Sequence, residues 1–346
     1  MSKQIMTVLG PVPPEELGIT LAHEHIFCDL SRLWQKPSDP SLERLVEKPV
    51  SGDDLEVLRS NVLVSKDNLH FVDVESVVEE LMEFKRMGGS GVVEMSNADM
   101  GRNIAILKEV SQKIGVHIIA ASGHYIEKFH SDYVSTDSID TLASRIAREV
   151  LEGIEGKEVK AGMIGEIGTS YPMTSQEEKV LRAAGRAQLQ TGAPLNVHLS
   201  YPRREGLRII EILEEEGVPL QHVIFSHVDE APMTPEFLEY HVRLAEKGVY
   251  LEYDDFGQKE YYPALGIVPV DDSERIDFLL KLIDQGYLHQ ILLSQDVCIK
   301  INLARYGGMG YSHILKNVVP MMRHVGMSEQ QIKAMLVDNP RRALAF

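Results

Sequence analysis

The chain has 346 residues, of which 44% are hydrophobic and 25% are charged, a composition typical of globular proteins with a large buried core. Its formal net charge of -17 disfavours nucleic acid as a partner, because phosphate binding requires clustered Lys and Arg, and it also disfavours an anionic membrane surface. The sequence shows no transmembrane run and no N-terminal signal core, and its two cysteines, Cys28 and Cys298, provide no disulfide framework. We therefore expect a soluble, cytoplasmic protein.

Short apolar runs rich in β-branched residues alternate with amphipathic segments along the chain. The runs predict eight strands, at 18–25, 91–96, 116–123, 162–168, 194–200, 222–228, 248–255 and 290–296. The segments between and after them predict helices at 73–89, 102–114, 138–153, 175–191, 204–216, 234–247, 273–286 and 311–325. Ser328 begins a further capped helix near the C-terminus.

Eight βα units without a linker favour a single (β/α)8 TIM barrel domain over residues 1–346. A doubly wound open sheet is the alternative, but such sheets usually carry a Gly-rich phosphate turn after the first strand, where this chain has a histidine pair. A polar insertion at about 29–73 separates the first strand from its helix. Loops of this length are uncommon without a role, so we interpret the insertion as a lid or a dimer contact.

The first predicted strand ends in His-Glu-His, and side chains two apart on a strand point to the same side. His23 and His25 are therefore expected to enter the barrel mouth while Glu24 points away. Active sites of such barrels lie at the C-terminal ends of the strands, and the other strand ends carry further metal-ligand types. These are Glu166, His198, His227 and Asp296.

This arrangement predicts a site for two divalent ions. His23, His25 and Asp296 would hold one ion, because a closed barrel brings the last strand beside the first. His198 and His227 would hold the second, and Glu166 could bridge the two. Cys28 and Cys298 follow proposed ligands closely, but we interpret them as small buried apolar side chains.

The remaining histidines do not fit this pattern. His117 and His222 open their predicted strands, which places them at the opposite end of the barrel, where a structural role is expected. The others fall on predicted loops or helices, where surface positions are expected: His70, His130, His241, His289, His313 and His324.

The block "GITLAHEHI" resembles the N-terminal signature of the phosphotriesterase family of the amidohydrolase superfamily. The resemblance continues through nearly the whole chain, in "AGMIGEIGTS", "NVHLS", "FSHVDE", "YLEYDDFG", "LLSQD" and "RYGGMGYSHIL". It implies a distorted (β/α)8 barrel with a binuclear metal centre on the same six residues. The ions would be zinc, or manganese, cobalt or iron, since histidine and carboxylate ligands suit all four.

The chain departs from many family members at strand four, where they bridge the metals with a carboxylated lysine. Here the strand contains Glu166, and the nearest lysine, Lys160, lies roughly 20 Å back along an extended strand. The departure makes efficient phosphotriester hydrolysis an unexpected natural activity. Tyr125, in "SGHYI", matches the tyrosine that lactonases of the family place over the metals. Asp255 stands where some lactonases carry arginine, and would favour a substrate with a hydroxyl or amine.

The resemblance implies hydrolysis of an ester-type bond, for which we expect a lactone or carboxylate ester, for example a phosphorylated sugar lactone. The metals would activate a water molecule and polarise the substrate. Asp296 would accept a proton from that water and pass it to the leaving group, and Tyr125 would orient the carbonyl. Arg305 and Tyr306, in the loop after strand eight, are candidates for binding an anionic group of the substrate.

Three alternatives remain open at this point. The chain could be a phosphotriester hydrolase, a mononuclear amidohydrolase or deaminase, or a non-catalytic barrel that metals stabilise and that binds a ligand. The partner expected is a small molecule, and a homodimer is a reasonable assembly.

Overall fold

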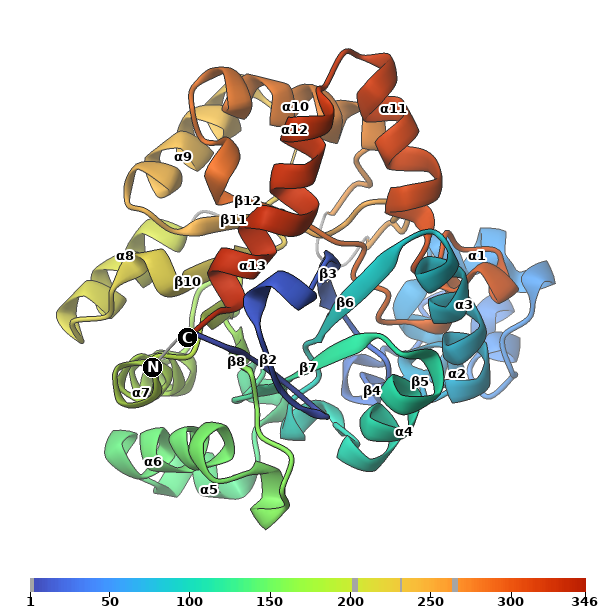
Figure 1. Ribbon diagram of the computed structural model, residues 1–346. Coiled ribbons are helices and arrows are strands. Elements are labelled where there is room, and N and C mark those ends of the chain that lie inside the picture. The colour runs from blue at the N-terminus through green and yellow to red at the C-terminus, as the bar shows by residue number, and fades with distance from the viewer. Residues whose placement is uncertain (1–2, 201–204, 231, 263–266) are drawn as a thin grey trace.

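The computed structural model describes residues 3–200, 205–230, 232–262 and 267–346. Its centre is a parallel eight-stranded sheet in the order β12-β11-β10-β9-β8-β7-β6-β3, so each strand pairs with its neighbour along the chain (Figure 1). These strands are β3 (Ile19–Glu24), β6 (Gly89–Glu94), β7 (His117–Ser122), β8 (Met163–Gly168), β9 (Leu195–His198), β10 (Val223–Ser226), β11 (Tyr250–Tyr253) and β12 (Ile291–Leu293). The eight predicted strands and the barrel fold are confirmed.

The first and last strands of the sheet approach each other and almost close the barrel. Just beyond the end of β12, the backbone NH of Asp296 donates to the carbonyl oxygen of His23 on β3, at 3.3 Å. Alternate side chains of the strands fill the interior, among them Ala22, Val93 and Ile119, and all three are buried. The interior is thus a packed core, as in other barrels of this class, and functional side chains can gather only at its ends.

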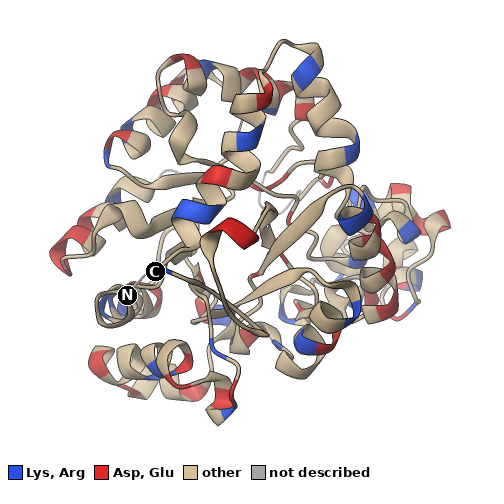
Figure 2. Ribbon diagram, in the orientation of Figure 1, with Lys and Arg blue, Asp and Glu red and all other residues tan. Residues whose placement is uncertain are grey.

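Helices surround the sheet, and Figure 2 shows positions of both acidic and basic residues along them, while the central strands consist mostly of uncharged residues. The helices of the repeating units are α3 (Val74–Arg86), α4 (Ile104–Ile114), α6 (Ile139–Leu151), α7 (Ser175–Thr191), α8 (Gly206–Glu215), α9 (Pro235–Glu246), α10 (Asp272–Asp284) and α11 (Val319–His324). Local signals set their ends. For example, Asn103 caps α4 by accepting from the NH of Ile106, and Gly115 ends it in the left-handed region at φ 71°.

The insertion is a folded unit without long elements. It contains α1 (Leu55–Arg59) and α2 (Lys66–Leu69), together with short 3-10 turns. Its two ends pair as the antiparallel strands β4 (Cys28–Asp29) and β5 (His70–Phe71), which closes it at the base. In Figure 1 it lies to one side of the barrel, beside α3. The short helix α5 (Asp132–Thr136) belongs to the loop after β7.

The chain termini add structure before and after the barrel. The helix predicted to begin after Ser328 is confirmed as α12 (Glu329–Lys333), which Ser328 caps. A hairpin of β1 (Ile5–Thr7) and β2 (Gly10–Val12) and the final helix α13 (Asn339–Leu344) were not predicted from the sequence. Gln4 and Phe346 exchange backbone hydrogen bonds of 3.0 Å in both directions, so the two ends of the chain lie side by side. Within the described ranges, no helix is long and apolar enough to cross a membrane.

A buried ion pair joins α10 to the loops after β10 and β11. Arg275 is 2% exposed, and its Nε donates to Asp229 Oδ2 at 2.6 Å. The two oxygens of Asp229 also accept the backbone NH groups of Asp254, at 3.1 Å, and Asp255, at 3.2 Å. One carboxylate therefore fixes two loops, and the arginine neutralises its charge.

Replacing Arg275 by methionine should strongly destabilise the fold, because it leaves Asp229 as an uncompensated buried charge. We expect the free energy of unfolding to fall by about 3–5 kcal/mol, measured by urea denaturation. Arg323→Met is the matched control, since Arg323 pairs with Glu329 on the exposed surface, and it should leave the midpoint nearly unchanged. Equal shifts in the two variants would contradict this account.

Candidate metal centre

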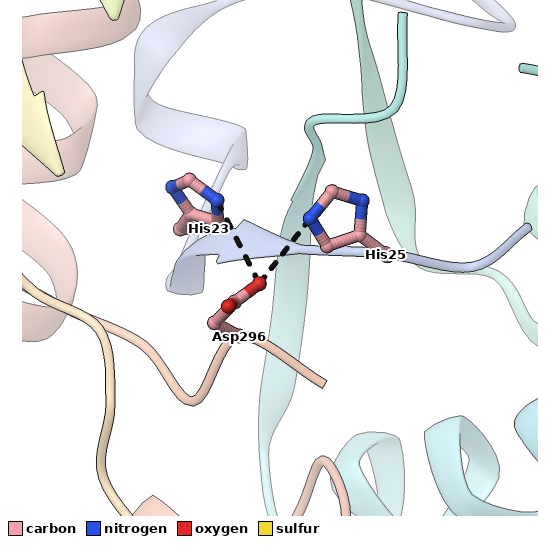
Figure 3. Close-up of side chains that lie close together, drawn as sticks. All are labelled: His23, His25 and Asp296. Carbon is pink, nitrogen blue, oxygen red and sulfur yellow. Dashed lines mark ion pairs between the residues drawn. The ribbon is translucent and has the colours of Figure 1, made fainter. Parts of the chain in front are cut away.

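Three side chains from opposite ends of the sequence converge where the barrel closes (Figure 3). The Nε2 atoms of His23 and His25 lie 3.8 and 3.2 Å from Oδ1 of Asp296. All three residues are buried. His23 and His25 reach the same carboxylate because they stand two apart on β3, as the alternation of a strand requires.

Glu166 at the end of β8 joins this group to a second pair of histidines. Its Oε1 atom lies 2.7 Å from Nδ1 of His198 and 2.7 Å from Nε2 of His227. The same oxygen is 3.7 Å from Nε2 of His23. The strand register accounts for the meeting, because His198 pairs with Gly168 on one side and with Ser226 on the other. One carboxylate oxygen thus lies between both sets of imidazoles.

Two of these residues have an unusual backbone. His227 has φ 56° and Asp296 has φ 46°, in the left-handed region that residues other than glycine rarely adopt. Hydrogen bonds to buried carboxylates hold both residues in this conformation. The NH of His227 donates to Asp254 Oδ1 at 2.8 Å, and Glu24 accepts the NH groups of Gln295 and Val297, which flank Asp296. Strained backbone that the surroundings enforce is typical of functional sites.

Further carboxylates orient the histidines from behind. Nδ1 of His23 lies 3.1 Å from Glu252 Oε2 and 3.2 Å from Asp254 Oδ2. Nδ1 of His227 lies 3.2 Å from Asp254 Oδ1. These contacts fix the rings with Nε2 directed toward the cluster, which is the usual support for a metal-binding histidine.

The electrostatics keep two carboxylates charged. Burial raises the pKa of Glu166, but the charge and hydrogen bond of His198 outweigh it and hold the pKa well below its usual range. Burial likewise opposes the charge of Asp296, and the hydrogen bond and charge of His25 lower its pKa. Burial disfavours a charged His227, yet Asp254 and Glu166 raise its pKa well above the ordinary value. The cluster therefore stabilises positive charge between its carboxylates.

The residues present fit divalent metal ions. Within the part of the chain that the structure describes, His23 Nε2 and Asp296 Oδ1 are buried and have no hydrogen-bond partner. Ligand-type atoms of His23, His25 and Asp296 lie within 4.8 Å of one another, as do those of His23, Glu166 and His227. Buried polar atoms without partners are costly, and imidazole and carboxylate are ligands that zinc and related ions prefer.

A cavity of about 330 Å³ opens over the cluster and is lined by His25, Glu166, His198, His227 and Asp296. Tyr125 also lines it, with its ring 5.1 Å from that of His198, and His130 Nε2 bonds the Tyr125 carbonyl oxygen at 2.7 Å. Asp255 lines the cavity too and is buried. The structure thus brings these two candidates to the six ligand-type residues. The volume is in the range of small-molecule sites.

Arg305 and Tyr306 do not lie at the cluster of ligand-type residues. Neither is among the described residues that line the cavity. Arg305 Nη1 donates to Ser76 Oγ at 2.9 Å, and the Tyr306 hydroxyl donates to Asp73 at 2.8 Å. Both side chains therefore bind the first turn of α3, where Asp73 is the N-cap. The loop after β12 turns outward to α3, so the expected contact with an anionic substrate group has no support in this geometry.

Two histidines expected on the surface are buried instead. His241 is 1% exposed, and its Nδ1 lies 2.8 Å from the Tyr253 hydroxyl. Burial lowers its pKa to about 3, so it is a neutral core residue. His313 is 3% exposed, with Nε2 2.6 Å from Asp272. The burial of His241 could have been predicted from the helical spacing, because His241 shares one helical face with Phe237 and Leu244.

Glu252 and Asp254 are functional residues that were not predicted from the sequence. Their signal was available in "YLEYDD", where two carboxylates stand two apart at the end of a strand, as the two histidines do on β3. Ser96 was also missed, and its hydroxyl lies 2.8 Å from His25 Nδ1. No spacing in the sequence indicates that contact, because it joins the ends of two strands.

Asp254→Asn should weaken metal binding about 10–100-fold, because the amide no longer orients His23 and His227 as a charged acceptor. Competition with a fluorescent chelator measures the affinity. Asp54→Asn is the matched control, since Asp54 is also a buried carboxylate but bonds Lys48 and Ser51 in the insertion. The interpretation fails if both variants bind metal as tightly as the parent chain.

Comparison with known proteins agrees with this geometry. The sequence profile of the phosphotriesterase family matches residues 3–344. N-acetyltaurine hydrolase from Homo sapiens is 37% identical over 350 residues, which covers 100% of this chain and 99% of that protein. A resiniferatoxin-binding protein from Rhodobacter sphaeroides has a TM-score of 0.96 and 37% identity, covering 99% of this chain and 94% of that one.

A lactonase from Listeria monocytogenes has a TM-score of 0.77 at 27% identity, and the alignment covers 99% of this chain and 98% of the lactonase. The similarities extend over essentially full lengths, so they include the strand ends that carry the cluster. The chain is a member of the phosphotriesterase family of metal-dependent hydrolases.

Proposed function

We propose that this protein hydrolyses an N-acyl amide, with N-acetyltaurine as the first substrate to test, by means of two divalent metal ions. The main support for two metal ions is the position of Glu166 Oε1 between the two sets of histidines. The choice of an amide is supported by the relatives named N-acetyltaurine hydrolase, at 36–37% identity over the whole chain.

Hydrolysis of a carboxylic ester or lactone is the second candidate. The similarity to a lactonase favours it, and esters and amides are both cleaved by addition of water to an acyl carbon. The replacement of a bridging lysine by Glu166 still argues against efficient phosphotriester hydrolysis. Zinc is the first ion to test, followed by manganese, cobalt and iron.

The proposed ligand sets follow the distances in the cluster. His23, His25 and Asp296 would hold one ion and His198 and His227 the other, with Glu166 shared between them. Bound ions supply Lewis acidity that lowers the pKa of a water and polarises an acyl oxygen. Asp254 and Glu252 hold the histidine rings in place during turnover.

Asp296 is the residue best placed to move the proton. Its Oδ1 is buried without a hydrogen-bond partner among the described residues and its side chain lines the cavity, so the carboxylate can accept a proton from the attacking water. It then passes this proton to the leaving group, which an amide requires more than an ester because a free amide anion is a poor leaving group. Tyr125 stays protonated, since burial raises its pKa well above 10, and its phenol can donate to the acyl oxygen.

A panel of N-acetyltaurine, other N-acyl amides, lactones, acetate esters and a phosphotriester tests the proposal on metal-loaded protein. We expect the highest kcat/KM on an N-acyl amide, loss of activity with a chelator, and recovery when metal returns. Asp296→Asn should abolish turnover without unfolding the protein, because its amide cannot accept the proton. Preferred cleavage of the phosphotriester would overturn the amide assignment, and an active Asp296→Asn variant would overturn the proton route.

A further inference from the structure

The cavity over the metal centre has two chemically different sides. The insertion supplies one side with apolar side chains throughout, namely Leu30, Leu33, Val62, Leu63 and Leu69. The loops after β8 to β11 supply the other, more polar side with Ser170, Ser200, Glu230, Asp255 and Gln258, and they also place Tyr171, Tyr262 and Ile267 in the lining. We call the first set the insertion wall.

Each side of the cavity is close in sequence to one of the two proposed ligand sets. Leu30 follows His25 by five residues, and its NH bonds the carbonyl oxygen of Leu69 at 2.9 Å, which draws both ends of the insertion to the first ligand set. Ser200 follows His198 by two residues and Glu230 follows His227 by three, so the polar side belongs to the second set.

The insertion wall is apolar although the insertion as a whole is not. The insertion is rich in charged residues, but Glu43, Lys48 and Glu56 are exposed and absent from the described cavity lining. Asp54 is buried but is paired with Lys48 and Ser51, and it too is absent from the described cavity lining, so the insertion presents only apolar side chains to the cavity. A charged substrate group on this side would lose its hydration without gaining a partner.

We infer that the insertion wall is a binding subsite for the acyl chain of the substrate, and that it selects apolar acyl groups. This inference rests on the proposed acyl hydrolysis. The leaving group takes the polar side, where Asp255 Oδ2 is buried without a hydrogen-bond partner among the described residues and can accept an N–H or O–H. Each methylene buried against the wall should tighten binding about fourfold.

The chain contains an intrinsic fluorescent reporter for binding at this subsite. Its single tryptophan, Trp34, lies in the insertion directly after Leu33. The Trp34 indole NH donates to the carbonyl oxygen of Val64 at 2.9 Å, and the NH of Gln35 donates to that of Leu63 at 2.9 Å. Occupation of the wall should therefore change the tryptophan fluorescence without any need for turnover.

The test titrates metal-loaded protein with acetate, butyrate and hexanoate, the acids that acyl hydrolysis would release, and follows Trp34 fluorescence. We expect Kd to fall about fourfold for each added methylene. Leu63→Asn, a change of nearly equal size, should remove most of this dependence because it makes the wall polar.

Leu42→Asn is the matched control. Leu42 is also a half-buried leucine of the insertion, but it is not among the described residues that line the metal cavity. It lines a neighbouring hollow that meets the insertion wall at Val62 and Leu63. It should keep the chain-length dependence of the parent. Equal Kd values for acetate and hexanoate, or the same effect of both variants, would overturn the subsite.

The outcome separates this inference from the proposed function. Chain-length-dependent binding without cleavage of any N-acyl amide or ester would refute the activity and leave the subsite standing. Cleavage of such bonds with acids of all lengths bound equally would refute the subsite and leave the activity standing.

Discussion

A single carboxylate oxygen, Oε1 of Glu166, lies within 2.7 Å of nitrogen atoms on His198 and His227 and within 3.7 Å of His23. The rest of the site depends on this position. The oxygen can lie there only if β8 ends level with its neighbours and the barrel closes enough to bring β3 across from β9. The fold therefore contributes to the chemistry by fixing where eight strands end, while loops supply the substrate contacts.

Burying so many ionisable groups requires compensation, and the structure shows how it is arranged. Asp254 and Glu252 face the histidines, and Arg275 neutralises Asp229, which in turn holds the backbone of Asp254. Glu24, the carboxylate of the His-Glu-His triplet, faces away from the cluster and accepts bonds from Ser294, Gln295 and Val297. It therefore locks the turn that carries Asp296, and has a structural rather than a chemical role.

The alternation of β-strands explains why much of the site could be predicted. His23, His25, Glu166, His198, His227 and Asp296 are located by where strands end, which apolar runs reveal. The behaviour of loops could not be predicted in this way. Arg305 and Tyr306 bind the first turn of α3 because their loop turns outward, and the hairpin of β1 and β2 consists of strands of three residues, too short to show a pattern. Contacts between strand ends, such as that of Ser96 with His25, depend on barrel closure and have no local signal.

The most direct test of the central claim is anomalous diffraction from crystals of metal-loaded protein. The account predicts two metal peaks with Glu166 between them, one beside His23, His25 and Asp296 and the other beside His198 and His227. One peak with Glu166 unligated would contradict the binuclear centre and favour a mononuclear hydrolase or deaminase. The absence of any peak in crystals soaked with saturating zinc would contradict the metal assignment altogether.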